Sequence, residues 1–294
     1  MKVLIFGATG FIGKAVNESL SEHHEVHQTT RLETTNDRQY AVDLLSRDAI
    51  KKVINFVQPE VIINAAGVVD PGADVFQNVT FTDNILNSVV EAGLKPRRIV
   101  TFGSAGEYGQ VPLAELPVDE ATELRANAGY GYAKKQEEEK ALSYRSQYEL
   151  PVVVARIFNP IGIGMADKFL VSRLKKQIEQ YRNGDRNSLE ISRKDSERDY
   201  IAVSDIATAI RALIEGNPVH SVYNIGSGAS MSNGDLLQLM IKSSKIESIP
   251  KVVETLAEPE PTVASRADIT RIQQELGWAP KQSIADIVEE IMND

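Results

Sequence analysis

Tyr130 and Lys134 are the residues of this sequence whose types and spacing point most directly to chemistry. They stand four positions apart in the segment YGYAK, so on a helix they would lie on one face. A free tyrosine has a pKa of about 10 and needs a neighbouring cation to exchange protons near neutral pH. Lys134 can supply that charge, so we expect the pair to act in acid–base catalysis.

Ser104 is the third candidate catalytic residue. It follows the apolar run Ile99–Phe102, inside the segment TFGSAGEYG. If this run is a strand of a doubly wound sheet, Ser104 lies at its carboxyl end, where such sheets present catalytic side chains. The serine and the tyrosine–lysine pair are weak signals separately, but together and in this order they predict one catalytic site.

A glycine motif, GATGFIG, directly follows the apolar run Val3–Phe6. Gly7 allows a tight turn, Gly10 allows the backbone to approach a pyrophosphate, and Gly13 allows close packing of helix on strand. The N-terminus of the following helix adds amide donors and the positive end of its dipole. The spacing is GxxGxxG rather than the usual GxGxxG, and it predicts a dinucleotide site.

The end of the expected second strand distinguishes between the two nicotinamide cofactors. Enzymes that use NAD place a carboxylate there for the ribose hydroxyls. Here residues 26–31 (VHQTTR) contain no carboxylate and end in Thr30 and Arg31, which suit a 2′-phosphate. NADP(H) is therefore favoured, NAD(H) is the alternative, and a solvated Arg31 is the other interpretation. Asp43, followed by Leu44, is placed to contact the adenine side.

Short, continuous apolar runs rich in Val and Ile must supply the elements that position these residues. They occur at residues 3–6, 61–63, 99–102 and 152–155. Continuous runs indicate strands that are covered on both faces, as in a parallel sheet. Helices are expected between them, near residues 12–22, 46–57, 74–92 and 130–148. This alternation predicts an α/β fold with a Rossmann-like, doubly wound parallel sheet.

The alternation of strands and helices ends after Pro160. A basic helical stretch near 167–182 and a polar segment follow. We expect an NADP-binding Rossmann domain over residues 1–160, which carries the catalytic residues. Residues 161–294 would form mainly a smaller α/β substrate lobe, with some segments returning to the main sheet. The charge run 134–140 (KKQEEEK) is expected to be a solvated helix face with i,i+4 pairs.

Composition excludes several classes of function. The 294 residues include 32 Lys and Arg against 41 Asp and Glu, and this net charge of −9 argues against a general binder of nucleic acid or anionic membranes. The absence of cysteine excludes thiolate metal sites, and His23, His24 and His27 are expected on a surface loop, so no metal site is predicted. No run approaches a membrane span or an export signal, and a cytoplasmic location is expected.

The motifs together resemble the extended branch of the short-chain dehydrogenase/reductase superfamily, the sugar-nucleotide epimerases, dehydratases and ketoreductases. The resemblance covers essentially the whole chain through GATGFIG, NAAG, GSAGEYG, YGYAK, RIFNPIG, RDYIAVSDIA and YNIGSG. Within that branch, GSAGEYGQVPLAELPVDEAT is most similar to nucleotide-sugar 4-ketoreductases of the GDP-4-keto-6-deoxymannose reductase type, which use NADPH.

The resemblance implies a role for each matching residue. Tyr130 would be the proton donor, Lys134 its partner on the nicotinamide ribose, and Ser104 the hydrogen-bond donor to the substrate carbonyl. The implied substrate-binding residues are Asn159 and Arg198, and Arg173 is added as a basic candidate for the same substrate. The implied cofactor-binding residues are Gly7, Thr9, Gly10, Phe11, Ile12, Gly13, Thr30, Arg31, Asp43, Leu44, Ala65, Ala66, Gly67, Tyr130 and Lys134. A homodimer formed through the helical stretches 74–92 and 130–148 is also implied, and solvated outer faces of these helices are the alternative.

The residues after Ser104 distinguish between the subclasses of this branch. A 4,6-dehydratase would need an acid/base pair there, but Ala105 and Gly106 follow, and Glu107 is one position too late. An epimerase oxidises and re-reduces its substrate on a tightly held NAD, whereas a net reductase exchanges NADPH. The basic end of the second strand favours a ketoreductase acting on a nucleotide-linked deoxysugar. A nucleotide-sugar epimerase and a non-catalytic NADP-binding sensor stay open as alternatives.

One departure from the family pattern concerns the substrate. The family usually carries an Arg ahead of the pattern AD…LGW, and by spacing from Trp278 this position is Glu258, in the acidic stretch 258–261. A carboxylate there would repel a diphosphate. Either the substrate is not a nucleoside diphosphate sugar or another basic residue takes over, the candidates being Arg266, Arg173, Lys176 and Arg186.

Overall fold

The main layer of the molecule is a parallel sheet. The computed structural model describes residues 1–31, 34, 36–70, 72–246, 248, 250–255 and 264–294. Within these ranges the sheet has seven strands in the order β11-β6-β5-β4-β1-β2-β3. They are β1 (Lys2–Phe6), β2 (Glu25–Thr30), β3 (Gln39–Ala41), β4 (Val61–Asn64), β5 (Arg98–Ser104), β6 (Val152–Ile157) and β11 (Val222–Ile225). The order reverses between β1 and β4, which defines a doubly wound sheet and confirms the expected fold class.

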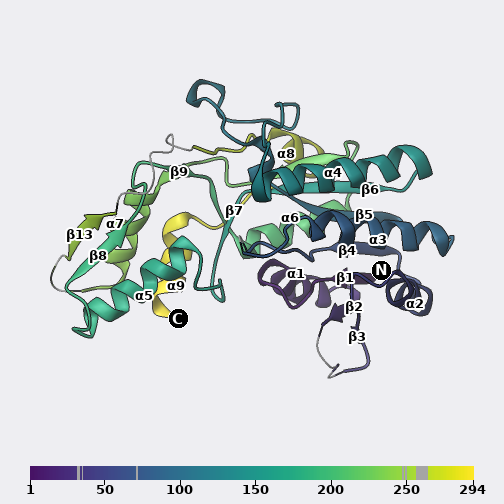
Figure 1. The fold of residues 1–294 in the computed structure, drawn as a ribbon, viewed down its shortest axis with the longest axis horizontal. Helices are drawn as coiled ribbons and strands as arrows, with labels where there is room; N and C mark the ends of the chain where they lie inside the picture. Colours follow the sequence, from purple (N-terminus) through teal and green to yellow (C-terminus); the bar gives the residue numbers. More distant parts are fainter. Residues whose placement is uncertain (32–33, 35, 71, 247, 249, 256–263) are drawn as a thin grey trace.

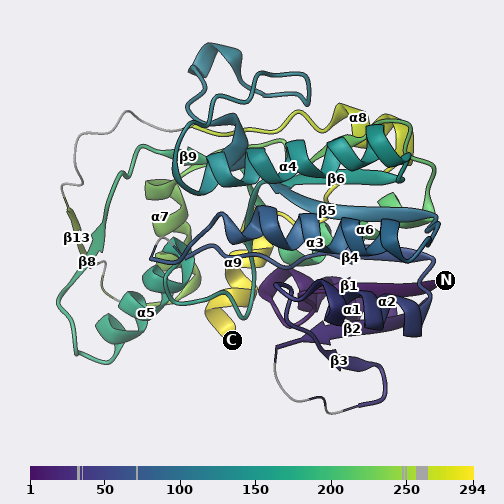
Figure 2. The same ribbon diagram turned by 45° about the vertical axis from the view of Figure 1, so that its right-hand side comes forward.

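Helices cover both faces of this sheet (Figure 2). In β1, Val3 and Ile5 belong to one apolar cluster, and Leu4 and Phe6 belong to another. Because side chains alternate along a strand, these clusters are the two faces of the sheet, which explains the unbroken apolar run. One face carries α1 (Phe11–Ser21) and α6 (Val203–Glu215), and the other carries α2 (Arg47–Val57), α3 (Gln77–Glu91) and α4 (Gly129–Tyr148).

A smaller group of elements lies beyond the carboxyl ends of the main strands, at the left of Figure 1. A third apolar cluster, which includes Leu174, Leu189, Leu237 and Val288, holds it together. Its helices are α5 (Leu170–Arg182), α7 (Asn233–Ser243) and α9 (Ile284–Asn293). Its strand pairs are β8 (Ser188–Ile191) with β13 (Lys251–Glu254), β7 (Asn159–Ile161) with β10 (Tyr200–Ala202), and β9 (Glu197–Arg198) with β12 (Met231–Ser232).

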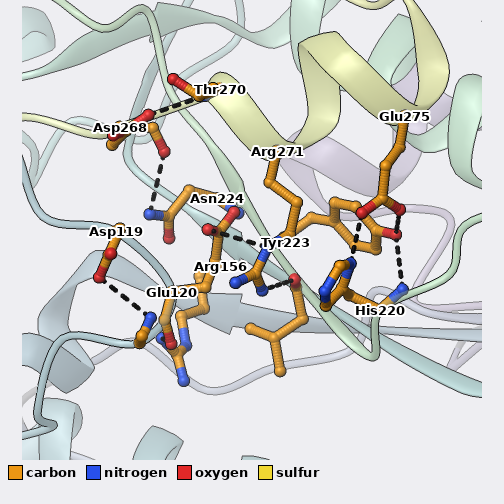
Figure 3. A network of polar contacts seen from close by, with 12 residues as sticks. Asp119, Glu120, Arg156, His220, Tyr223, Asn224, Asp268, Thr270, Arg271 and Glu275 are labelled. Carbon is orange, nitrogen blue, oxygen red and sulfur yellow. Dashed lines mark hydrogen bonds and ion pairs between the residues drawn. The ribbon is translucent and has the colours of Figure 1, made fainter.

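Helix α8 (Thr270–Leu276) is tied to the edge strand β11 by a polar network (Figure 3). The carboxylate of Glu275 accepts hydrogen bonds from the hydroxyl of Tyr223 and from the backbone N–H of Val219, and it pairs with the ring of His220. Arg271 donates to the carbonyl of Val222 at 2.9 Å. The network therefore closes the sheet edge with a segment that is distant in sequence.

The sequence predicted a surface loop for three histidines, and the structure differs for one of them. His27 lies inside β2 and is buried, with its ring hydrogen-bonded to Tyr40 and Glu25, so the expected surface loop is wrong for this residue. Separately, no helix in the described part of the chain is long and apolar enough to cross a membrane.

Candidate active site

The glycine loop has the geometry that a bound dinucleotide requires. Gly7 has φ +81°, and a Cβ on it would lie 2.5 Å from the backbone N of Ala66. A Cβ on Gly13 would lie 2.1 Å from the carbonyl O of Gly7, so helix and loop can meet only without side chains there. A Cβ on Gly10 would meet only this same carbonyl, at 3.4 Å, so the loop is open at the position where a pyrophosphate is expected.

The start of α1 also suits an anion. Gly10 caps this helix without a side-chain hydrogen bond, and no acidic residue occurs in the first turn. The first amide groups of a helix have no partner within it and point along the positive end of the dipole. Residues Thr9 to Gly13 can therefore bind the phosphates of a dinucleotide through the backbone, and the neighbouring β4 brings Ala65, Ala66 and Gly67 to the same edge.

The end of β2 contributes the second part of the cofactor region. β2 pairs in parallel with β1, so Thr30 ends on the same edge of the sheet as the glycine loop. Thr30 is buried and Arg31, the next residue, is exposed. Asp43 is exposed, its carboxylate accepts the amide of Leu45 at 2.9 Å, and Leu44 is half-buried. This geometry leaves the guanidinium of Arg31 accessible to a ligand phosphate.

Ser104 and Tyr130 are brought together by a close contact between a turn and a helix. Ser104 ends β5, and its hydroxyl accepts the amide of Gly106 at 3.1 Å in the following 3₁₀ turn, Ala105–Tyr108. A Cβ on Gly131 would lie 2.3 Å from the carbonyl O of Gly106, so α4 begins directly against this turn. The importance of Gly131 was missed from sequence, although its place inside YGYAK was a signal.

The surroundings of the Tyr130 hydroxyl act on its pKa in opposite directions. Burial raises the pKa, whereas the ammonium of Lys134 and a hydrogen bond with Ser104 lower it, and the net direction is upward. The residue as a whole is half-buried, but its hydroxyl lies deep among protein atoms. Tyr130 is therefore protonated at neutral pH, which suits a proton donor.

The charge run 134–140 is not a solvated face, which corrects the sequence-based expectation. Lys134, Glu137 and Glu138 are each less than 5% exposed, whereas Glu139 is exposed. The ammonium of Lys134 donates to the carbonyl O of Phe102 and to the carboxylate of Glu137, both at 2.5 Å. Each buried charge meets an opposite one: Lys134 and Glu137 pair with each other along α4, and Glu138 pairs with Arg156 of β6.

Arg156 of β6 is the second buried cation beneath this helix. Its guanidinium donates to both carboxylate oxygens of Glu138, at 2.5 and 2.8 Å, and to the hydroxyl of Tyr108 at 3.0 Å. The carboxyl group of Glu107 lies 3.7 Å from it and accepts the amide of Ser104 at 2.6 Å. Burial and the nearby Glu138 raise the pKa of Glu107 well above its usual value. Glu107 thus supports Ser104 from inside and does not face a substrate.

The three residues that the sequence assigned to substrate lie in different settings. The side-chain amide of Asn159 donates to the carbonyl O of Asp199 at 3.0 Å and to the hydroxyl of Ser265 at 3.3 Å. Arg198 is half-buried in β9 and donates to the carbonyl O of Glu197. Arg173 is exposed on α5 and lines a hollow of about 220 Å³ with Gln177 and Glu190 among its other walls. Glu258 and the residues around it lie outside the described residues.

Asp199 is a supporting residue that sequence reasoning missed, although it stands inside the motif RDY. It is fully buried, and its carboxylate accepts the amides of Ser227, Gly228 and Ala267 at 2.7, 3.1 and 2.9 Å. One side chain thereby joins its own segment, between Arg198 and Tyr200, to the segments at residues 227–228 and at Ala267. Its role is to hold the expected substrate side together.

Comparisons with known proteins identify the family of this chain. Residues 3–226 match the model of the NAD dependent epimerase/dehydratase family, and the chain belongs to this family. It is 25% identical to GDP-6-deoxy-D-mannose reductase of Pseudomonas aeruginosa, over 100% of this chain and 96% of that protein. It is 28% identical to a UDP-glucose 4-epimerase of Cyamopsis tetragonoloba, over 99% and 94%.

The fold is likewise similar to a solved structure, that of RMD from Pseudomonas aeruginosa complexed with NADPH. The TM-score is 0.88 at 25% identity, covering 99% of this chain and 97% of that one. These findings confirm the family resemblance drawn from the motifs and the expectation of an NAD(P)-dependent enzyme. The roles of the individual site residues are not tested by them and stay predictions.

Proposed function

We propose that this chain is an NADP(H)-dependent reductase of the keto group of a nucleotide-activated 6-deoxy sugar, of the 4-ketoreductase type. The observation that carries the proposal is the cluster of Ser104, Tyr130 and Lys134 at the end of β5, with Ala105 and Gly106 where a dehydratase needs its acid/base pair. The similarity to a GDP-6-deoxy-D-mannose reductase and to an NADPH complex supports the same subclass.

Each catalytic side chain has a defined task in this reaction. NADPH, when bound, supplies the hydride that adds to the ketone carbon. Tyr130 gives its proton to the carbonyl oxygen as negative charge develops there, and it regains a proton from solvent, so one ketone, one NADPH and one proton yield one alcohol and NADP⁺. Ser104 orients that oxygen with its hydroxyl. Lys134 holds a positive charge beside the hydroxyl of Tyr130 and the carbonyl oxygen.

Arg31 provides a test of the cofactor preference. In Arg31→Ala we expect the Kd of NADPH to rise about tenfold or more, with the Kd of NADH almost unchanged, because only NADPH carries the phosphate that the guanidinium would contact. Quenching of protein fluorescence on titration with each cofactor measures both constants. Arg38→Ala, which alters another exposed arginine beyond β2, is the matched control. An equal loss for NADPH and NADH would contradict this assignment.

A nucleotide-sugar epimerase is the second candidate, which the 28% identity to a UDP-glucose 4-epimerase favours. Such an enzyme returns the hydride to its own substrate. Protein purified with firmly bound NAD(H), and active without net NADPH consumption, would support this candidate. Protein purified without cofactor that consumes NADPH in proportion to alcohol formed would support the reductase.

The nucleoside diphosphate part of the substrate can be identified before the sugar is known. A thermal-shift panel with GDP, dTDP, UDP, CDP and ADP, each with NADP⁺ present, should show stabilisation by one nucleoside diphosphate, because a ligand that binds only the folded state raises the melting temperature. The matching 4-keto-6-deoxy sugar nucleotide is then assayed for NADPH oxidation. No shift with any nucleotide would overturn the nucleotide-sugar assignment and would agree with the acidic residue Glu258 at the usual arginine position.

The two parts of the chain have different proposed functions. Residues 1–160 would bind the cofactor and carry the catalytic groups, and residues 161–294 would mainly bind substrate, with Asn159, Arg173 and Arg198 at the sugar nucleotide. We also propose a cytoplasmic homodimer in which α3 and α4 of two copies pack together. Sedimentation velocity would give the oligomeric state.

A further inference from the structure

A buried ion pair lies directly behind the proposed catalytic pair. Glu137 stands one helical turn after Lys134 on α4, and their side chains are joined at 2.5 Å. Lys134 and Glu137 are 4% and 2% exposed. The ammonium of Lys134 has three N–H groups. One donates to Glu137, one donates to the carbonyl O of Phe102, and the third can donate to a ligand or to Tyr130.

The carboxylate of Glu137 is itself held by a chain of buried groups. The hydroxyl of Thr82 on α3 donates to it at 2.7 Å, and the side-chain amide of Asn64, at the end of β4, donates to that hydroxyl at 2.8 Å. Asn64 and Thr82 are 2% and 1% exposed. A fully hydrogen-bonded buried network of this kind has one low-energy arrangement, so Lys134 is fixed in position.

Charges from two elements face the hydroxyl of Tyr130. Lys134 and Glu137 come from α4, Glu107 comes from the 3₁₀ turn, and β5 contributes only the uncharged Ser104. The ammonium lowers the pKa of Tyr130, while burial, which acts most strongly, and both carboxyl groups raise it. Arg156 of β6 pairs with Glu138 and lies 3.7 Å from the carboxyl group of Glu107.

Lys134 and Glu137 act as one unit. Burial by itself, the largest influence, would lower the pKa of Lys134, but Glu137, together with Tyr130 and Glu107, more than offsets this and the pKa is raised. The lysine therefore stays charged, and the neighbouring carboxylate of Glu137 largely balances its positive charge. A balanced pair affects its neighbours much less than a bare ammonium does.

We propose that Glu137 is a positioning residue that fixes Lys134 and offsets its charge, so that Tyr130 stays protonated and the site is set for reducing a carbonyl rather than oxidising an alcohol. The inference rests on the proposed function only for its catalytic consequence. Reduction needs the phenol as an acid, whereas oxidation of an alcohol needs the phenolate as a base. A bare lysine would favour the phenolate.

The variant Glu137→Gln tests this directly, since it removes the charge and keeps the shape. The amide oxygen can accept from Lys134 and the NH₂ group can donate to the hydroxyl of Thr82, so both contacts can be retained. We expect the pKa of Tyr130 to fall by about one pH unit or more. The readout is an NMR titration of ¹³Cζ-labelled tyrosine, in which the resonance is assigned by its absence in Tyr130→Phe.

Activity supplies the second readout. For reduction, kcat/KM should be level while Tyr130 is protonated and should fall about tenfold per pH unit above its pKa. In Glu137→Gln this fall should begin at a pH about one unit lower than in the parent. Glu137→Asp, which keeps the charge, and Glu139→Gln, on the exposed face of the same helix, should both keep the parental profile.

A double variant covers the case in which Glu137→Gln does not fold. Replacing a buried ion pair by apolar side chains is often neutral for stability, so Lys134→Met with Glu137→Met is expected to fold. If the two charges offset each other, the pKa of Tyr130 in this variant stays close to the parental value. A marked rise would mean that Lys134 acted as an unbalanced cation, and it would overturn the proposal.

The two readouts separate the inference from the proposed function. Coincident tyrosine titrations of the parent and Glu137→Gln would overturn the positioning role, whatever the substrate. A lowered pKa in protein that reduces no nucleotide-linked ketone would support the charge balance and contradict the assigned reaction instead.

Discussion

Replacing Tyr130 by phenylalanine is expected to lower kcat for ketone reduction by about 10²–10⁴-fold while leaving NADPH binding intact. The variant lacks only the hydroxyl, which is the group that would protonate the oxygen of the reacting carbonyl. The glycine loop and the end of β2, which would bind the cofactor phosphates, lie on other elements. A rapid-quench or steady-state assay of NADPH oxidation measures the loss, and fluorescence titration measures cofactor affinity.

Tyr132→Phe is the matched control for this prediction. Tyr132 lies on the same helix, and its hydroxyl accepts a hydrogen bond from Gln136 at 3.0 Å. We expect its turnover to stay within a few-fold of the parent. Turnover of Tyr130→Phe near the parental rate would remove Tyr130 from the reaction and leave the cofactor-binding sensor as the better description.

Replacing Arg156 by leucine should cause the largest loss of stability among the site-supporting residues. Arg156 is 4% exposed, and its guanidinium donates to both oxygens of Glu138. Without it a buried carboxylate stands unpaired, beside the carboxyl group of Glu107. Removing one partner of a buried ion pair costs about 3–5 kcal/mol, which corresponds to a fall in melting temperature on the order of 10 °C for a chain of this size.

Thermal denaturation followed by circular dichroism checks this expectation. Arg38→Leu, at an exposed position, should change the free energy of unfolding by less than about 0.5 kcal/mol. The loss for Arg156→Leu should shrink when Glu138→Leu is added, because the second change removes the unpaired charge. Equal stability of Arg156→Leu and the parent would show that the pair contributes only what an exposed ion pair does.

The sequence by itself determined the main strands and helices of residues 1–160 and the order of the motifs. Each continuous apolar run became a buried strand of the main sheet, because both faces of a doubly wound sheet are covered. The glycine motif predicted the turn between β1 and α1, since its spacing reflects local backbone geometry. Tyr130 and Lys134 could be paired from sequence because four positions on a helix return to one face.

Only the tertiary structure decided which charged residues are buried and what they meet. The run KKQEEEK has the composition of a solvated face, yet Lys134, Glu137 and Glu138 point into the protein. Their partners, Phe102, Thr82 and Arg156, lie on other elements, 18 to 55 positions away. Periodicity along one helix cannot indicate such partners. The free energy of a buried charge depends on what surrounds it in space, and this is known only once the layers have packed.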